Sequence, residues 1–353
     1  MELKPKDTGI PVDVIRVLAI VLVILLHASI EPTPNLQMPT QDAIVHFLAM
    51  NIYNSISRVS VPLFVMLSGA LLLQPTKNEP LGVFFKKRFL RIGPAFIFWG
   101  AAYFAWRFFV NHEALSASSI VQGILTGPYF HFWFLYMLIG LYLITPILRL
   151  VVSHAERRLL TYFILLWFFA IAINPIIGIV AGYRIDTNVF VIGGWVGYFL
   201  LGVYLQKERM RPVFLYGLFL VGLVWTIIGT WIVTFTVGGE ASYFFYDFLT
   251  ANVILASAAL FQLLLGVSPD FFAKRSSRFN SLASLISQYT LPIYLFHIMI
   301  LESLEKGYFG FKLSVTTLNP FIEIPLITVV TLFICVAVIF LLKKIPLVRK
   351  IIG

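Results

Sequence analysis

The sequence has 353 residues, of which 59% are hydrophobic and 12% are charged. With a mean hydropathy of +0.92, the chain has too much apolar surface for a water-soluble core, which excludes a soluble globular protein. A net charge of +10 would suit nucleic acid in a soluble protein, but its distribution here is that of a membrane protein, so no nucleic-acid partner is expected. The single cysteine, Cys335, excludes an internal disulfide framework.

Ten apolar stretches are long enough to span a membrane, which takes about 20 helical residues. They cover residues 11–30, 44–73, 83–110, 131–152, 159–178, 188–206, 213–235, 242–266, 283–304 and 322–345. The connections are short, and no repeat or low-complexity tract interrupts them. The sequence therefore predicts an all-α integral membrane protein, a single bundle of about ten transmembrane helices that forms one domain over residues 1–353 with no separate soluble domain.

Basic residues are distributed unequally between the two sides of the predicted bundle. One side carries Lys4, Lys6, Lys77, Lys86, Lys87, Arg88, Arg91, Arg149, Arg157, Arg158, Lys207, Arg209, Arg211, Lys274, Arg275, Arg278, Lys343, Lys344, Arg349 and Lys350. The alternate connections hold few: Arg107, Arg184, Lys306 and Lys312. Because cytoplasmic loops are enriched in Lys and Arg, both termini are predicted to be cytoplasmic in a multi-pass protein of the cell membrane.

The first stretch contains Asp13, Arg16 and His27 on one helical face. Arg16 and His27 are eleven residues apart, or about 16 Å along a helix axis. Ionisable residues inside a membrane helix are costly, so they are functional-site candidates. The alternative interpretation is that Arg16 anchors the cytoplasmic end while His27 makes an interhelical hydrogen bond.

The second stretch carries a polar stripe that ends at Arg58, with Asn51, Asn54 and Ser55 at helical spacing before it. An arginine at that depth needs a partner or a wet cavity, either in a functional site or in a structural salt bridge. Pro62 and Gly69 further along suit either helix packing or function.

A basic cluster of Lys87, Arg88 and Arg91 opens the third stretch at the cytoplasmic side. Arginine forks bind phosphate in a bidentate manner, so the cluster suits a phosphorylated cytoplasmic donor. The alternative is ordinary anchoring against anionic lipid.

Aromatic residues accumulate later in the chain, where Tyr129, His131 and Trp133 suit either an interface belt or the wall of a sugar-binding pocket. The ninth stretch places His297 at a depth like that of His27, followed by Glu302. His297 is a second candidate base, or a neutral imidazole satisfied by a neighbouring helix. No P-loop, GxSxG, HExxH or CxxC motif occurs.

The succession of these motifs resembles the acyltransferase 3 family of integral membrane acyltransferases. The motifs that carry the resemblance are Asp13, Arg16 and His27; residues 57–69; residues 87–92; residues 133–146; and residues 291–297 ending at His297. The resemblance covers nearly the whole chain and agrees with the family's ten-helix core. The chain is similar to the stand-alone members that O-acetylate surface glycans, and it lacks the C-terminal hydrolase-like domain of two-domain members.

The resemblance implies that acetyl-CoA, or another acyl-CoA, is the donor substrate and that a carbohydrate or glycolipid hydroxyl is the acceptor, with no metal. His27 is then expected as general base and Arg58 as oxyanion stabiliser, with Asp13 and Arg16 completing the catalytic group. Arg16, Lys87, Arg88, Arg91 and Trp133 are expected to bind the donor. Tyr142, His297 and Glu302 are expected near the substrate.

Two other functions stay open at this point. A transporter or flippase would use Arg16, His27, Arg58 and Glu302 as a substrate or proton path. A structural membrane subunit would leave the deep Arg58 without a purpose. Membrane lipids are expected neighbours in every case, and a homodimer is one option for the oligomeric state.

Overall fold

A computed structural model describes residues 9–29, 40–74, 79–181, 193–208, 210–237, 239–314 and 318–353. Within these ranges the chain forms helices and turns and no β-strand. The first half contains α1 (Val12–Ala28), α2 (Gln41–Ser57), α3 (Ser60–Leu72), α4 (Leu81–Phe109), α5 (Ala117–Thr126), η2 (Phe130–Phe132), α6 (Trp133–His154), α7 (Arg157–Phe168), η3 (Phe169–Ile173) and α8 (Asn174–Ala181). The second half contains α9 (Gly194–Lys207), α10 (Pro212–Thr236), η5 (Gly239–Tyr246), α11 (Ala251–Leu265), α12 (Ser277–Gln288), α13 (Thr290–Lys306), α14 (Pro320–Leu342) and α15 (Pro346–Ile351).

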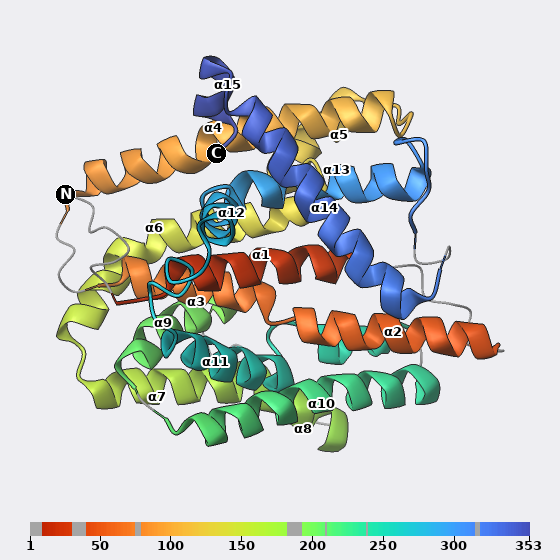
Figure 1. Cartoon of the computed structure of the whole chain (residues 1–353). Coiled ribbons are helices and arrows are strands. Elements are labelled where there is room, and N and C mark those ends of the chain that lie inside the picture. Colours follow the sequence, from red (N-terminus) through yellow and green to blue (C-terminus); the bar gives the residue numbers. More distant parts are fainter. Residues whose placement is uncertain are drawn as a thin grey trace.

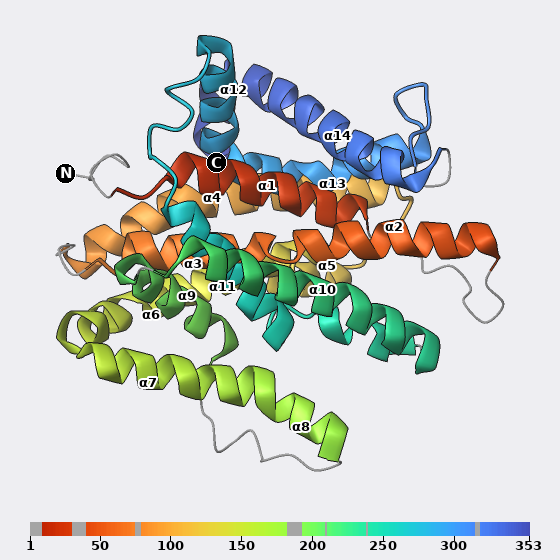
Figure 2. The same cartoon turned by 60° about the horizontal axis from the view of Figure 1, so that its bottom comes forward.

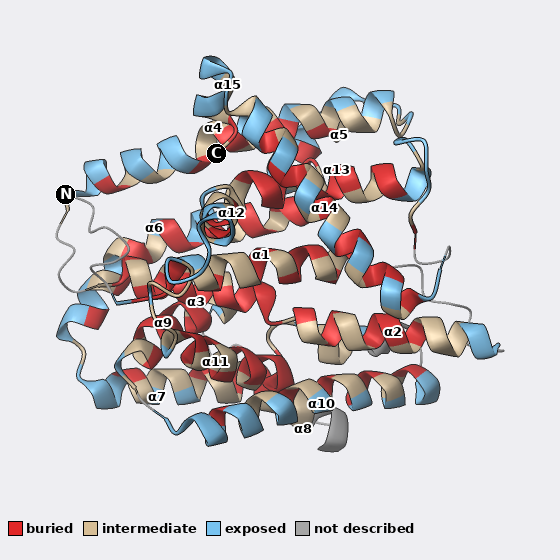
Figure 3. Ribbon diagram, viewed as in Figure 1, coloured by how far each residue is buried: buried red, intermediate tan, exposed pale blue. Residues whose placement is uncertain are grey.

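Most of the long helices run along one common direction, which is horizontal in both Figure 1 and Figure 2. α1 lies inside this bundle and contacts α2, α3, α12, α13 and α14. Figure 3 shows that buried residues concentrate on the inner helices, while the outer helices have exposed faces. Those exposed faces include large apolar residues such as Val213, Val221 and Ile228 of α10. Apolar side chains that face outward along a helix are expected to contact lipid.

Each predicted apolar stretch coincides with helices, but the predicted number of spans is not confirmed. Six helical segments in the described ranges are long and apolar enough to cross a membrane, and a seventh arises if the bent pair α12–α13 is one span. α1 and α9 have only 17 and 14 residues. α4 begins with the basic residues around Arg88, which lower the hydropathy of its first turns.

Two predicted stretches are not single straight helices. The stretch 44–73 is divided into α2 and α3 around Arg58, which follows the last residue of α2. The stretch 283–304 combines α12 and α13, which meet at an angle of 84°. Apolar content alone does not reveal such breaks, because apolar residues continue on both sides of each one.

Close packing of α3 against α9 depends on two glycines. A Cβ atom on Gly69 would lie 1.8 Å from the backbone oxygen of Phe199, and one on Gly202 would lie 2.0 Å from that of Met66. Only a residue without a side chain allows the two backbones to approach this closely. The packing interpretation of Gly69 is therefore confirmed.

Some residues used for the predicted orientation lie outside the described residues, namely Lys4, Lys6, Lys77, Arg184 and Arg209. The cytoplasmic location of both termini accordingly stays a prediction from the distribution of charge.

Candidate active site

Three histidines from three different elements form a histidine cluster inside the bundle. His27 is in the last turn of α1, His131 is in η2 and His297 is in α13. The ring centroid of His297 is 5.1 Å from that of His27 and 5.6 Å from that of His131. His131 and His297 are fully buried, whereas His27 is partly accessible. His27 is therefore the member of the cluster with accessible surface.

Tyr294 of α13 connects the two buried histidines. Its hydroxyl donates to the backbone carbonyl of His131 over 2.7 Å. Its own carbonyl is 2.6 Å from Nδ1 of His297. Because a carbonyl oxygen can only accept, Nδ1 of His297 carries the proton, and Nε2 of the neutral ring is a proton acceptor. This Nε2 atom is buried and has no hydrogen-bond partner within the described ranges.

Arg58 lies at the break between α2 and α3, close enough for its charge to act on His27. Its Nε atom donates to Oδ1 of Asn54 over 2.7 Å, and the Asn54 amide donates to Oγ of Ser29 over 3.3 Å. Its guanidinium carbon is 4.6 Å from the centroid of the Tyr246 ring. An amide and an aromatic face hold the guanidinium without neutralising it. The alternative of a structural salt bridge is therefore not supported.

Arg16 lies near the other end of α1, about 16 Å from His27 by the helical rise. Arg91 of α4, Asp13 and Tyr142 of α6 all lie near enough to Arg16 to act on it electrostatically. Asp13 accepts a hydrogen bond from Ser287 over 2.5 Å rather than pairing with Arg16. Asp13 is thus a link between α1 and α12, distant from the histidine cluster, and not a partner of His27.

The basic cluster on α4 divides into residues with different surroundings. The guanidinium of Arg88 lies over the rings of Phe84 and Tyr142, at 5.2 and 5.8 Å, and Arg91 is exposed. Lys87 forms an ion pair of 3.1 Å with Glu79, which lies in the connection before α4. Arg16, Arg88 and Arg91, defined here as the arginine group, remain the candidates for binding an anion.

Glu79 joins Lys87 of α4 to Arg149 of α6 at one end of the bundle. Its second oxygen is 3.3 Å from the Arg149 guanidinium. Partial burial of Glu79 favours its protonated form, but the hydrogen bonds from Lys87 and Arg149, with their charges, outweigh this and lower the pKa of its carboxyl. The Glu79 contacts thus join Lys87, the neighbour of Arg88 on α4, to Arg149 of α6.

Three further predicted residues lie at separate places. Trp133 packs against Trp195 and Phe248, with ring centroids 5.5 and 6.0 Å apart, so it lies beside the Arg58 region and not with the arginine group. Tyr142 lies with Arg88, as described above. Glu302 of α13 accepts hydrogen bonds from Trp106, over 2.7 Å, and from the hydroxyl of Tyr129.

Glu302 therefore has structural partners in α4 and in the segment before η2. In the transporter interpretation, Glu302 would be the last residue of a path that begins at Arg16. Here its carboxylate already accepts two hydrogen bonds. Within the described ranges, no group of three or more His, Cys, Asp or Glu side chains is arranged to hold a metal ion.

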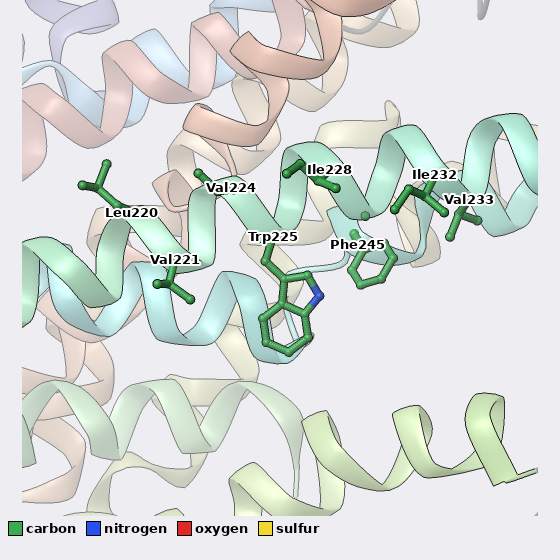
Figure 4. A pocket seen from close by; sticks show the side chains of 9 residues that line it. Leu220, Val221, Val224, Trp225, Ile228, Ile232, Val233 and Phe245 are labelled. Carbon is green, nitrogen blue, oxygen red and sulfur yellow. The ribbon is translucent and has the colours of Figure 1, made fainter.

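An apolar groove of about 630 Å³ lies apart from these residues on the outer face of α10 (Figure 4). It is lined by Leu220, Val221, Val224, Trp225, Ile228, Gly229, Ile232, Val233 and Phe245. A lining without any charged residue suits a hydrocarbon chain and not a charged nucleotide. The groove is therefore not the donor site.

Sequence reasoning missed His131 as a member of the site. It was assigned with Tyr129 and Trp133 to an aromatic belt or pocket wall, and its complete burial shows that the belt interpretation is wrong for His131. Asn54 and Tyr246 were also not recognised as the partners of Arg58. The spacing of Asn54 and Arg58, one helical turn apart, was the only available signal.

Comparisons with known proteins find two curated relatives and one family. Two curated relatives from Staphylococcus epidermidis, both named probable poly-beta-1,6-N-acetyl-D-glucosamine export protein, are each 26% identical over 171 residues. The matched region is 48% of this chain and 45% of each relative, so it covers about half of the relatives' length. No solved structure matches the chain. Residues 11–340 match the profile of the acyltransferase 3 family, described as an acyltransferase domain, and the chain belongs to this family of membrane acyltransferases.

Proposed function

We propose that this protein is a membrane O-acetyltransferase that moves an acetyl group from cytoplasmic acetyl-CoA to a hydroxyl of a surface carbohydrate or lipid-linked glycan. The observation that carries the proposal is the position of two chemically different groups near the two ends of α1. The arginine group lies near one end and the histidine cluster near the other, about 16 Å apart. An extended thioester donor that enters from one side and an acceptor from the other would meet at His27.

The arginine group fits the donor's phosphates. Arg88 and Arg91 are one helical turn apart on α4, and the charge of Arg91 also acts on Arg16 of α1. Three guanidinium groups supply bidentate donors of the kind that phosphate groups accept. Lys87 would contribute only general positive charge, because it is already paired with Glu79.

His27 and Arg58 supply the chemistry in this proposal. His27 would remove the proton from the acceptor hydroxyl as that oxygen attacks the thioester carbonyl. Arg58, held by Asn54 and Tyr246 and acting on His27 by its charge, would stabilise the negative charge that develops on the carbonyl oxygen. The helix bundle around them would keep water from the thioester.

A carbohydrate acceptor is supported by two observations. Trp133, Trp195 and Phe248 form a group of aromatic rings beside Arg58, and such rings pack against the apolar faces of sugar rings. The matched relatives carry the name of an N-acetyl-D-glucosamine polymer. A sugar hydroxyl near these rings would lie on the Arg58 side of the site.

The decisive experiment follows acetyl transfer from radiolabelled acetyl-CoA by purified protein and by its His27→Ala variant. Loss of transfer is expected, by a factor of about 100 or more, because general base catalysis supplies that much. His154→Ala is the matched control, since His154 is exposed at the end of α6 and is expected to leave transfer unchanged. Full activity of His27→Ala would remove His27 as the base.

Export of a glycan is the second candidate, because the matched relatives are named export proteins. Reconstituted vesicles separate the two functions. Acetylation of an external acceptor by internal acetyl-CoA supports the transferase, whereas movement of unmodified glycan across the vesicle wall without acyl transfer supports export.

A further inference from the structure

We propose that His297 and His131 are positioning residues for His27, with His297 holding the His27 ring in the tautomer that accepts the proton of the substrate hydroxyl. This inference rests on the proposed function, in which His27 is the general base. It assigns a role to His131, which no sequence motif had indicated, and it replaces the alternative role of His297 as a second base.

The separation of the His27 and His297 rings fits one hydrogen bond between them, whereas the His131 ring packs edge-on beside His297. Two imidazole rings joined by an N–H···N hydrogen bond of about 2.9 Å have centroids about 5 Å apart. The His27–His297 and His297–His131 centroid distances are 5.1 and 5.6 Å. Hydrogen bonds in catalytic groups are commonly long before the substrate binds and shorten in the complex. Small rotations of the two rings would therefore complete a hydrogen bond between His27 and His297.

The tautomer of His297 determines which of the two rings donates the hydrogen bond and which accepts it. Nδ1 of His297 donates to the Tyr294 carbonyl, which leaves Nε2 as an acceptor buried without a partner in the described ranges. An N–H group of His27 is the donor that this acceptor needs. If one nitrogen of His27 donates to His297, the other nitrogen is unprotonated and available as the base.

The nearby Arg58 explains why a histidine suits this role better than a carboxylate. In the Ser-His-Asp arrangement a buried carboxylate orients the catalytic histidine. A carboxylate next to His27 would pair with the nearby Arg58 guanidinium and take it away from the reaction. A neutral imidazole orients the ring without that competition.

The proton that leaves the acceptor hydroxyl passes through His27 to the departing thiolate. As the acceptor oxygen bonds to the thioester carbon, its O–H bond breaks and the proton moves to the free nitrogen of His27. The proton on the other nitrogen of His27 is then shared with Nε2 of His297, which spreads one positive charge over two rings. When the C–S bond breaks, the His27 proton moves to the thiolate, and His297 returns the shared proton.

His131 supports His297 through two contacts. Its ring lies next to that of His297, and its carbonyl accepts from the hydroxyl of Tyr294, the residue whose own carbonyl fixes Nδ1 of His297. Removal of the His131 ring would loosen the ring of His297 without touching the substrate.

The experiment compares His297→Gln and His131→Gln with the His154→Gln control in the acetyl-transfer assay. Glutamine preserves hydrogen bonding but cannot share a proton, so a merely structural role would be rescued by it. We expect kcat to fall about 10- to 100-fold in His297→Gln, because His297 shares a proton, and to fall less in His131→Gln, because the His131 ring only packs against His297. The KM for acetyl-CoA is expected to stay unchanged, because the arginine group lies near the far end of α1. Wild-type kcat in both glutamine variants would overturn the proposal.

A second test uses the unmodified protein, so it does not depend on whether the variants fold. Nitrogen NMR of histidine-labelled protein in detergent distinguishes protonated from unprotonated ring nitrogens. Protonated Nδ1 and unprotonated Nε2 are expected for His297, and protonated Nε2 would contradict the inference. Absence of acetyl transfer by the wild-type protein would instead contradict the proposed function, so the two failures are distinguishable.

Discussion

Arg58 is held by the side-chain oxygen of Asn54 and by the rings of Tyr246 and Phe248, with Asp247 near enough to act on it by its charge. In the proposed mechanism its guanidinium is charged and near His27. Arg58→Lys preserves the charge but not the planar fork, and we expect kcat to fall about 100-fold, the typical cost of losing an oxyanion donor. Steady-state acetyl transfer measures this, with Arg157→Lys at an exposed ion pair as the control. An Arg58→Lys enzyme with normal kcat would show that only charge matters there.

The candidate site residues differ in how far the sequence could predict them. His27, Arg16 and Arg91 were identifiable because each is an ionisable residue in an apolar or membrane-adjacent helix. His131 was not identifiable, because its neighbours His27 and His297 are far from it in sequence and meet it only through tertiary packing. The hydrogen bond from Ser287 to Asp13 was not predictable, because helical spacing shows a shared face but not which neighbouring helix offers a partner.

At the scale of helices, the contact between α3 and α9 is the most sensitive to added volume. Gly202→Ala would force a Cβ against the backbone oxygen of Met66. We expect a loss of about 1–3 kcal/mol in the free energy of unfolding, the usual cost of overpacking. Thermal unfolding in detergent measures this loss.

The matched control for that substitution is Gly217→Ala in α10. A Cβ at Gly217 meets nothing within 4 Å, and alanine has the higher helix propensity, so no destabilisation is expected. Equal melting temperatures for Gly202→Ala and wild type would show that α3 and α9 can separate without cost.

Helix positions were largely predictable and helix breaks were not. Hydrophobicity located every long helix, because lipid requires a continuous apolar segment. Tertiary contacts that the sequence does not show lie close to the division of residues 44–73 and to the bend between α12 and α13, namely the hydrogen bonds of Asn54 to Ser29 and of Ser287 to Asp13. Among the candidate site residues, Arg58 lies at such a break.

For the whole molecule, Glu79 makes stability depend on pH. Its pKa in the folded state is below the ordinary value of 4.5, so its ion pairs with Lys87 and Arg149 stabilise the fold above that value. This stabilisation is lost as the pH falls through the lowered pKa. Glu79→Gln should therefore melt at a lower temperature than wild type at about pH 7, and the difference should shrink as the pH falls below the ordinary value of 4.5 and through the lowered pKa. A difference that persists in acid would mean that Glu79 acts by packing and not by charge.

The length of α1 has a consequence for which donors the enzyme can use. In the proposed mechanism, a helix of 17 residues keeps Arg16 of the arginine group and the base His27 at a fixed separation. A small activated acid such as acetyl phosphate has its carbonyl directly beside its phosphate, so the arginines would hold that carbonyl about 16 Å from His27. Only a donor with a long, flexible arm between its anionic end and its thioester can reach. The enzyme would then select its acyl donor by the length of the donor's arm. The fixed distance along α1 would set that length without any contact to the arm.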